Sequence, residues 1–193
     1  ATDDVGLSSS LSATITLDTL VPVVTITEPP EDGLVVPTPL LPLRATVTDA
    51  TATRVTSSPE GIDALLEFGS GEVFGDVALV EGENVLSISA EDRAGHVGGD
   101  SVTVVLDTVA PELTGIEPAD GAVVGLPSVS LRVHVYDESA TEVTFGAHAF
   151  TWGVGGAHTA EADVDLLPTW DELTGDAFID VVLTDAAGHV TTV

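Results

Sequence analysis

The sequence contains no cysteine, no methionine and no lysine, and its only basic residues apart from five histidines are four arginines. Without cysteine, no disulfide can stabilise the fold. The arginines stand against 32 acidic residues, which gives a formal net charge of −28. Such a charge repels a phosphate backbone, so nucleic acid is excluded as a partner, and anionic membrane surfaces are disfavoured. Metal cations, salt or a basic partner are suitable counter-charges.

Aromatic residues are also scarce, at 4% of the chain, whereas hydrophobic residues make up 44%. The core must therefore be built from Val, Leu, Ile and Ala. Val, Thr and Ile recur in short stretches, and this composition favours β-strands. No apolar run approaches the roughly 20 residues of a membrane-spanning helix, so no membrane insertion is expected in this chain.

An internal repeat is the strongest feature of the sequence. The segment from Ala1 to Pro22 aligns without a gap with the segment from Ala90 to Pro111, and a third copy begins at Leu183. The first two segments share a turn, an alternating strand and the motif Leu-Asp-Thr-x-x-Pro. Further pairs match in between, namely Glu28-Pro29 with Glu117-Pro118, Asp32-Gly33 with Asp120-Gly121, and Leu43-Arg44 with Leu131-Arg132.

The repeat divides the chain into units of roughly 90 residues, close to the size of one β-sandwich domain. We expect residues 1–18 to be the terminal strand of a preceding repeat. Residues 19–107 form the first domain, called unit one here. Residues 108–193 form the second, unit two, with an incomplete last strand. The joints between units fall at Asp18–Pro22 and Asp107–Pro111.

Short alternating runs bounded by turn residues predict about seven antiparallel strands in each unit, an all-β immunoglobulin-like sandwich. In unit one the expected strands are 23–27, 41–48, 53–57, 64–68, 72–79, 85–90 and 101–106. In unit two they are 112–116, 129–136, 142–145, 147–152, 160–166, 177–184 and a short last strand. An insert at 167–173 is expected to form a helical turn, with Trp170 as a lid on the sandwich.

The pattern Ala-x-Asp-x-Ala-Gly-His, an alternating strand and then Leu-Asp-Thr-x-x-Pro resembles the bacterial immunoglobulin-like (Big-type) repeats of surface adhesins and secreted multidomain proteins. The resemblance covers essentially the whole chain, but His96 and His189 stand where such repeats usually carry Asn. It implies a non-enzymatic spacer or adhesive stalk, extracellular, secreted or at the cell surface. The implied partners are neighbouring repeats of the same longer chain and a surface glycan or other cell-surface protein.

Carboxylates should converge at the joints, because the exit of one sandwich lies near the turns at the entry end of the next. Asp18 should approach Asp49 and Asp92, and Asp107 should approach Asp137, Glu138 and Asp185. Ca²⁺ takes six to eight oxygen ligands, so we predict structural calcium at each joint. The competing interpretation is local, since Asp is common in turns where its side chain bonds backbone amides. His96 and His189 are interpreted as turn residues that bond the backbone.

Enzymatic activity is not expected. The sequence has no nucleophile elbow, no phosphate loop with Lys and no His-Glu-x-x-His motif. Asp163 and Asp165 could resemble the pair of catalytic carboxylates of a glycosidase. Because they occupy alternate positions of an expected strand, they are more readily explained as a row of side chains that faces solvent. His134, His148 and His158 lack a zinc-type spacing.

The sequence is also compatible with two alternative functions. Tyr136, Trp152 and Trp170 could form a stacking platform for sugar, as in a carbohydrate-binding accessory module of a secreted polysaccharide-active protein. Alternatively, residues 9–17 could complete unit two of a neighbouring copy and build a head-to-tail fibre by strand addition.

Overall fold

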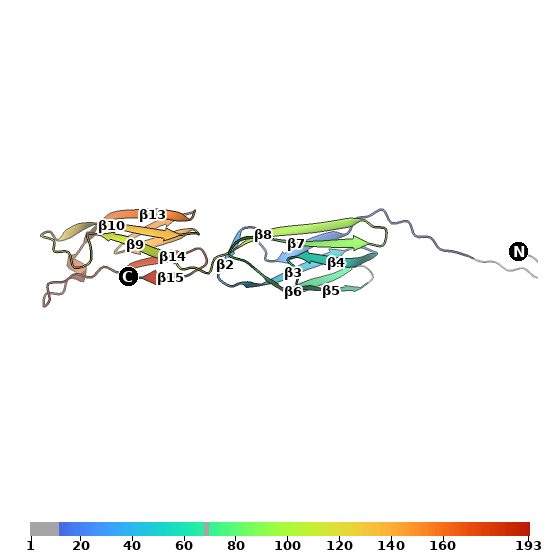
Figure 1. The fold of residues 1–193 in the computed structure, drawn as a ribbon, viewed down its shortest axis with the longest axis horizontal. Coiled ribbons are helices and arrows are strands. Elements are labelled where there is room, and N and C mark those ends of the chain that lie inside the picture. Colours follow the sequence, from blue (N-terminus) through green and yellow to red (C-terminus); the bar gives the residue numbers. More distant parts are fainter. Residues whose placement is uncertain (1–11, 68–69) are drawn as a thin grey trace, which may run out of the picture.

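The computed structural model describes residues 12–67 and 70–193, and in this part of the chain nearly all regular structure is β-strand. The one helical element there is a single 3₁₀ turn at Leu167–Thr169, which agrees with the helical turn predicted for the insert. No helix among the described residues is long and apolar enough to cross a membrane. Figure 1 shows two β-sandwiches placed end to end, with the N-terminal segment extending from the free end of the first. Residues 1–11 of the predicted preceding repeat lie outside the described residues.

Unit one is a sandwich of two four-stranded sheets. The first sheet has the order β1-β3-β6-β5, formed by Val23–Glu28, Leu40–Thr48, Ser70–Ala78 and Ile62–Glu67. The second has the order β2-β8-β7-β4, formed by Leu34–Val36, Val97–Leu106, Gly82–Asp92 and Ala52–Ser58. With the strands named in chain order, this is the arrangement of an immunoglobulin constant-type domain, to which the short β2 is added.

Strand β3 illustrates why these segments pair as they do. Leu43, Ala45 and Val47 are buried and alternate with exposed residues, so one face of the strand faces the core, as predicted. The short β2 was not among the predicted strands. It pairs in parallel with β8 from Leu34↔Val104 to Val36↔Leu106. Three residues are too few to show a periodicity in the sequence.

Unit two has seven strands and a different sheet order. One sheet is β13-β10-β9, formed by Gly156–Asp165, Ser128–Asp137 and Glu112–Glu117. The other is β12-β11-β14-β15, formed by His148–Trp152, Thr141–Phe145, Val181–Asp185 and Val190–Thr192. The all-β sandwich is confirmed for both units.

One pair of corresponding strands, β5 in unit one and β12 in unit two, belongs to different sheets in the two units. The repeated strand map did not predict this difference. In unit two Phe145 pairs with His148, so a two-residue turn joins β11 to β12 and Gly146 takes a φ of +56°. So tight a hairpin keeps both strands in one sheet. In unit one the longer connection through Pro59 and Gly61 instead lets β5 pair with β6.

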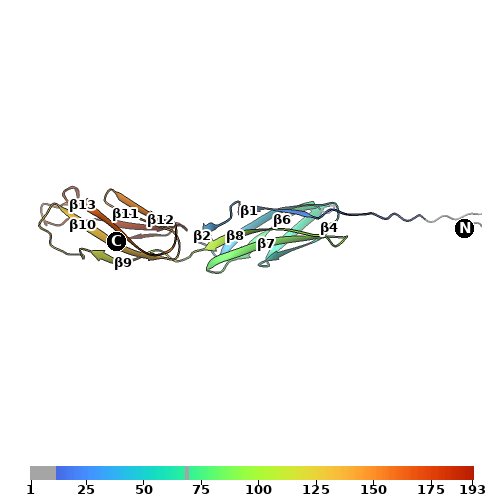
Figure 2. The same cartoon turned by 90° about the horizontal axis from the view of Figure 1, so that it is seen from above.

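Each unit has its own core. The core of unit one is aliphatic and includes Leu43, Val77, Leu86, Ile88 and Val104. The core of unit two is smaller and centres on Phe145, Val133, Val143, Val181 and Leu183. Figure 2 shows from a second direction that the two sandwiches follow one another along one axis. The limits at residues 18/19 and 107/108 stay predictions.

Candidate cation-binding joints

The turn between the last two strands has the same geometry in both units. In unit one it runs from Asp92 to His96: the Asp92 N–H donates to the His96 carbonyl, and the His96 N–H donates to Asp92 Oδ1 at 2.8 Å. Asp185 and His189 repeat both bonds in unit two. Gly95 and Gly188 each take a φ of +89°, a conformation that glycine adopts without steric cost.

The imidazole of each turn histidine also bonds its own aspartate. His96 Nδ1 lies 2.8 Å from Asp92 Oδ2, and His189 Nδ1 lies 2.7 Å from Asp185 Oδ2. Both carboxylates are fully buried. The sequence interpretation anticipated the backbone bond of the histidine but missed this side-chain pair. The repeated spacing of Asp and His four residues apart was the available signal.

At the first joint the exit residue of the preceding segment reaches this pair. Ligand atoms of Asp18, Asp92 and His96 all lie within 4.8 Å of one another. The Thr51 hydroxyl donates to Asp18 Oδ2, and the Thr51 N–H donates to Asp49 Oδ1 at 2.6 Å. The predicted approach of Asp18 to Asp92 is therefore present, while Asp49 lies beside the group without belonging to it.

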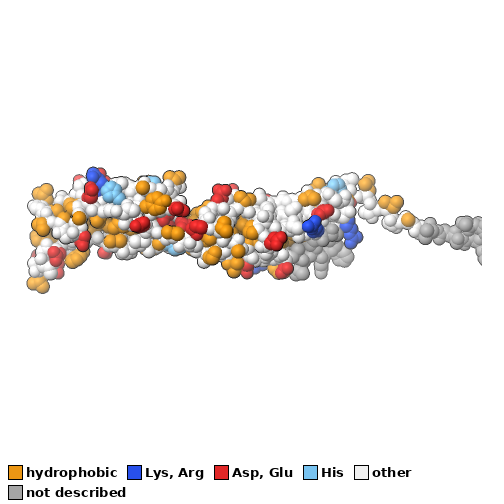
Figure 3. Space-filling view, in the orientation of Figure 1, with side chains coloured by type: hydrophobic (Ala, Val, Ile, Leu, Met, Phe, Trp, Pro, Cys, Tyr) orange, Lys and Arg blue, Asp and Glu red, His pale blue; other side chains and the backbone are white. Residues whose placement is uncertain are grey.

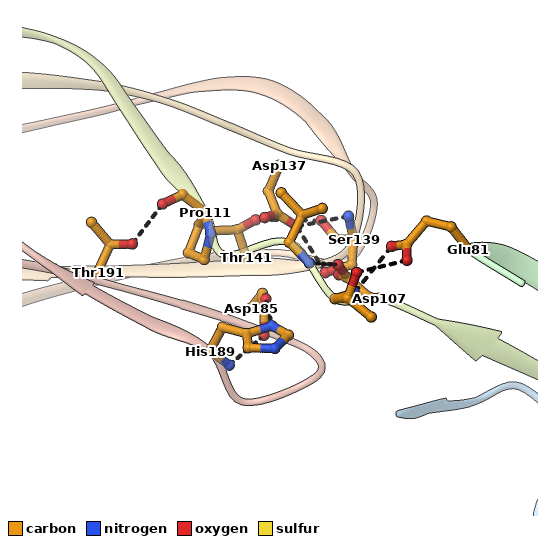
Figure 4. Close-up of polar contacts among 11 residues, drawn as sticks. Glu81, Asp107, Pro111, Asp137, Ser139, Thr141, Asp185, His189 and Thr191 are labelled. Atoms are coloured by element: carbon orange, nitrogen blue, oxygen red, sulfur yellow. Dashed lines mark hydrogen bonds and ion pairs between the residues drawn. The ribbon is translucent and has the colours of Figure 1, made fainter. Parts of the chain in front are cut away.

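The second joint repeats the arrangement with Asp107, Asp185 and His189, whose ligand atoms are also within 4.8 Å of one another. Figure 4 shows Asp107 next to the turn that carries Asp185 and His189. Asp107 is only 4% exposed, and its Oδ1 accepts the Val109 N–H at 3.1 Å. Its Oδ2 is buried without a hydrogen-bond partner among the described residues.

The other residues predicted near Asp107 do not join this group. Asp137 is buried, but its Oδ1 accepts the N–H and the hydroxyl of Ser139, at 2.7 and 2.8 Å. Glu138 is exposed. Of the seven candidate metal ligands, the structure therefore gathers Asp18 with Asp92 and Asp107 with Asp185. It leaves Asp49, Asp137 and Glu138 outside and adds His96 and His189.

The Asp92–His96 pair alters the protonation of both members. The hydrogen bond to the Asp92 carboxylate raises the pKa of His96, and the charges of Asp18 and Asp49 add to this effect. Burial alone would raise the pKa of Asp92, but the hydrogen bonds from the side chain and backbone of His96 outweigh burial and lower that pKa. The pair is therefore at full strength with His96 protonated and Asp92 ionised.

These shifts predict a pH window for the stability of unit one in metal-free buffer. The His96 contribution is present below its unfolded pKa of about 6.5 and is lost as pH rises through the raised pKa. The Asp92 contribution is present above about pH 4 and is lost as pH falls through the lowered pKa. In the presence of EDTA, the difference in thermal unfolding midpoint between the native chain and H96N should be largest between these two pH limits. A difference in midpoint that does not vary with pH would contradict a stabilising ion pair between Asp92 and His96.

The three aromatic candidates for sugar stacking lie on different elements. Tyr136, on β10, is 44% exposed, and Trp170, in the insert, is 52% exposed. Trp170 therefore does not act as the expected lid. Trp152, on β12, is stacked against His158 at a centroid distance of 4.9 Å and against Phe150 at 6.4 Å. Since these rings cover Trp152, no observation favours a shared platform.

Comparisons with known proteins add little to this description. No protein-family model and no curated protein matches the sequence. Among solved structures, the chain is similar to fibronectin(III)-like modules of Clostridium thermocellum CbhA, with 12% identity and a TM-score of 0.39, over 89% of this chain and 90% of that chain.

Two structures of titin domains are also similar. A chimeric titin Z1Z2 carrying a decorin peptide has 12% identity and a TM-score of 0.32, over 90% of this chain and 96% of that one. The titin Z1Z2 domains in complex with telethonin have 14% identity and a TM-score of 0.32, over 91% and 95%. Because these scores are low, the fold assignment rests on the strand order of the chain itself: each unit is an immunoglobulin-like or fibronectin(III)-like β-sandwich.

Proposed function

We propose that this chain is a non-enzymatic, extracellular structural segment, a spacer or adhesive stalk of bacterial immunoglobulin-like repeats whose joints are stiffened by divalent cations. The observation that carries the proposal is the recurrence of one group, two aspartates and a histidine, at both joints. The group links the exit residue of one unit to a turn of the next. A cation held there would restrain the angle between the two units.

Electrostatics at the second joint supports a bound positive charge. Asp107 and Asp185 are both buried, and their carboxylate oxygens lie within 4.8 Å of each other. Two like charges so close in a poorly hydrated site repel strongly. The buried Oδ2 of Asp107 has no partner to offset its loss of hydration. A divalent cation would neutralise both carboxylates and supply that partner.

The donor set bears on which cation would bind. The two carboxylates suit Ca²⁺, which would take its remaining oxygens from backbone carbonyls or water. The imidazole suits Zn²⁺, which accepts nitrogen ligands. The ligands would be Asp18, Asp92 and His96 at the first joint and Asp107, Asp185 and His189 at the second. The cation's contribution would be structural, with no catalytic step.

Direct contacts already hold the second joint in part. Glu81 accepts the N–H and the hydroxyl of Thr108, at 3.0 and 2.8 Å. The Thr191 hydroxyl donates to the Pro111 carbonyl at 2.7 Å, which ties the linker to β15. The first two bonds attach the linker to unit one and the third attaches it to unit two, so a cation at Asp107 would add a further restraint between the units.

Calorimetry after chelator treatment tests this function. Ca²⁺ and Zn²⁺ should be titrated separately into the chain, and at least one should bind with a stoichiometry of one ion per joint. Small-angle scattering with and without the ion would then show whether the joint becomes more rigid. If neither ion binds below millimolar concentration, the cation-stiffened joint is wrong.

A further inference from the structure

The two joints differ in the partners of their exit aspartates, Asp18 and Asp107. Asp18 Oδ1 accepts the N–H of Leu20 at 3.1 Å, and Asp107 Oδ1 accepts the corresponding N–H of Val109 at the same distance. The second oxygen is different. Asp18 Oδ2 accepts the Thr51 hydroxyl, whereas Asp107 Oδ2 is the one buried side-chain oxygen or nitrogen of the described residues without a hydrogen-bond partner.

The difference begins in the turns that follow β3 and β10, where Thr51 and Ser139 occupy equivalent positions. The backbone bond is the same in both turns. The Thr51 N–H donates to Asp49 Oδ1 at 2.6 Å, and the Ser139 N–H donates to Asp137 Oδ1 at 2.7 Å. The Thr51 hydroxyl then donates across the joint to Asp18. The Ser139 hydroxyl instead donates to Asp137 Oδ1 at 2.8 Å, and Figure 4 shows these two residues side by side.

The extra methyl group of threonine accounts for this divergence. Two heavy atoms on Cβ restrict χ1, so the backbone of the turn largely sets the direction of the Thr51 hydroxyl. Serine lacks the methyl group, and its hydroxyl turns to the carboxylate nearest in the sequence, as serine commonly does in such turns. One methyl group therefore decides whether the exit aspartate receives a hydroxyl donor from the next unit.

A cation gains different amounts of free energy at the two exit aspartates. At Asp107 it would be the first partner of a buried Oδ2 and would offset the hydration that burial removed. At Asp18 the Thr51 hydroxyl already offsets part of that loss, and the positive end of its dipole opposes the cation. Figure 3 shows acidic side chains on the visible surface where the two units meet, and their field also attracts cations to the second joint.

We propose that the second joint takes up a divalent cation before the first joint does, and that Thr51 and Ser139 set this order. At the first joint the Thr51 hydroxyl holds the oxygen that the cation takes at the second. The two affinities should differ by at least about tenfold, which corresponds to the contribution of one hydrogen bond to a buried charged group. This inference rests on the proposed cation-stiffened joints and adds the order in which they fill.

The order gives the chain a graded response to cations. At a concentration between the two dissociation constants, an ion links unit one to unit two, while the segment before unit one is held by the Thr51 hydroxyl. Threonine at this position of a repeat would then indicate a joint that is held partly without an ion. Serine there would indicate a joint that depends on one.

An NMR titration of the native chain tests the order directly. The backbone amides of His96 and His189 report on the first and second joints, because each donates to the aspartate carboxylate of its own group. Ca²⁺ and Zn²⁺ should be added separately to the chelator-treated chain. With the ion that binds, the His189 signal should reach half of its total change at a free ion concentration at least about tenfold lower than the His96 signal. Variants H96N and H189N assign the two signals.

Exchanging the two hydroxyl side chains tests the cause of the order by calorimetry. D107N isolates the first joint, and in that background T51V should raise the affinity about three- to tenfold, since valine keeps the shape of threonine without its hydroxyl. D18N isolates the second joint, and in that background S139T should lower the affinity by a similar factor. The matched control S139A should leave the affinity unchanged, because the Ser139 hydroxyl bonds Asp137 rather than Asp107.

Equal half-points for His96 and His189, or earlier filling of the first joint, would overturn the inference and leave the cation-stiffened joint standing. An unchanged affinity in T51V, or an equal loss in S139A and S139T, would do the same. If no ion binds at either joint, the inference and the proposed function both fail. Unfolding curves in chelator identify any variant that does not fold, and the titration of the native chain is independent of the hydroxyl variants.

Discussion

Replacing Phe145 by alanine should destabilise unit two by about 3–5 kcal/mol and leave the unfolding of unit one unchanged. Phe145 is buried at the centre of the smaller core and stacks on Phe150 at a centroid distance of 5.5 Å. Its removal leaves a cavity that the surrounding strands can fill only in part. Differential scanning calorimetry should show a lower midpoint for one of two transitions.

Phe178 provides the matched control, since it lies in the same unit and is 67% exposed. F178A should change the free energy of unfolding by no more than about 0.5 kcal/mol. If F145A instead shifted both transitions together, the two cores would not unfold independently. The division into autonomous units would then be wrong.

Replacing Asp107 by asparagine should have opposite effects with and without cations. In the presence of a chelator D107N should be more stable than the native chain, because it removes a buried negative charge that faces Asp185. The substitution keeps the Oδ1 acceptor for the Val109 N–H and replaces the unpartnered Oδ2 by a hydrogen-bond donor. With cation present, calorimetry should show at least about tenfold weaker binding at the second joint.

The control for this experiment is D137N. Asp137 is also a buried aspartate at the joint end of unit two, but its Oδ1 is engaged by Ser139 and it does not belong to the three-residue group. D137N should leave the cation affinity unchanged. Undiminished cation binding in D107N, or lower stability of D107N in chelator, would show that Asp107 does not hold the ion.

Much of the fold was predictable from local pattern. On β3, the alternation of Leu43, Ala45 and Val47 with exposed residues is visible in the sequence, because side chains of a strand point to opposite faces in turn. The repeat added the expectation that a second sandwich follows the first. The repeat did not show that β5 and β12, which correspond in sequence order, belong to different sheets. The two-residue turn at Gly146 decides this in unit two, through contacts that strand-by-strand matching does not consider.

The joints show the same division between local and tertiary information. The sequence placed Asp18 with Asp92 and Asp107 with Asp185, because the repeat fixes the ends of each unit at which the exit and the turn must lie. It did not reveal the histidines as members of the group, since the direction of an imidazole depends on the turn formed around Gly95 or Gly188. It also could not separate Asp137 from Asp107, since both are acidic residues at the C-terminal end of a strand: Asp137 is the last residue of β10 and Asp107 directly follows β8.

By itself, the sequence determined the all-β class, the repeat of roughly 90 residues and the acidic character of the chain, because strand periodicity, self-similarity and charge are properties of the order of residues. Only the tertiary structure decided which carboxylate oxygen at the second joint is buried without a partner, and that His96 and His189 join the aspartates. Both depend on how neighbouring segments surround a group, and that follows from packing in space.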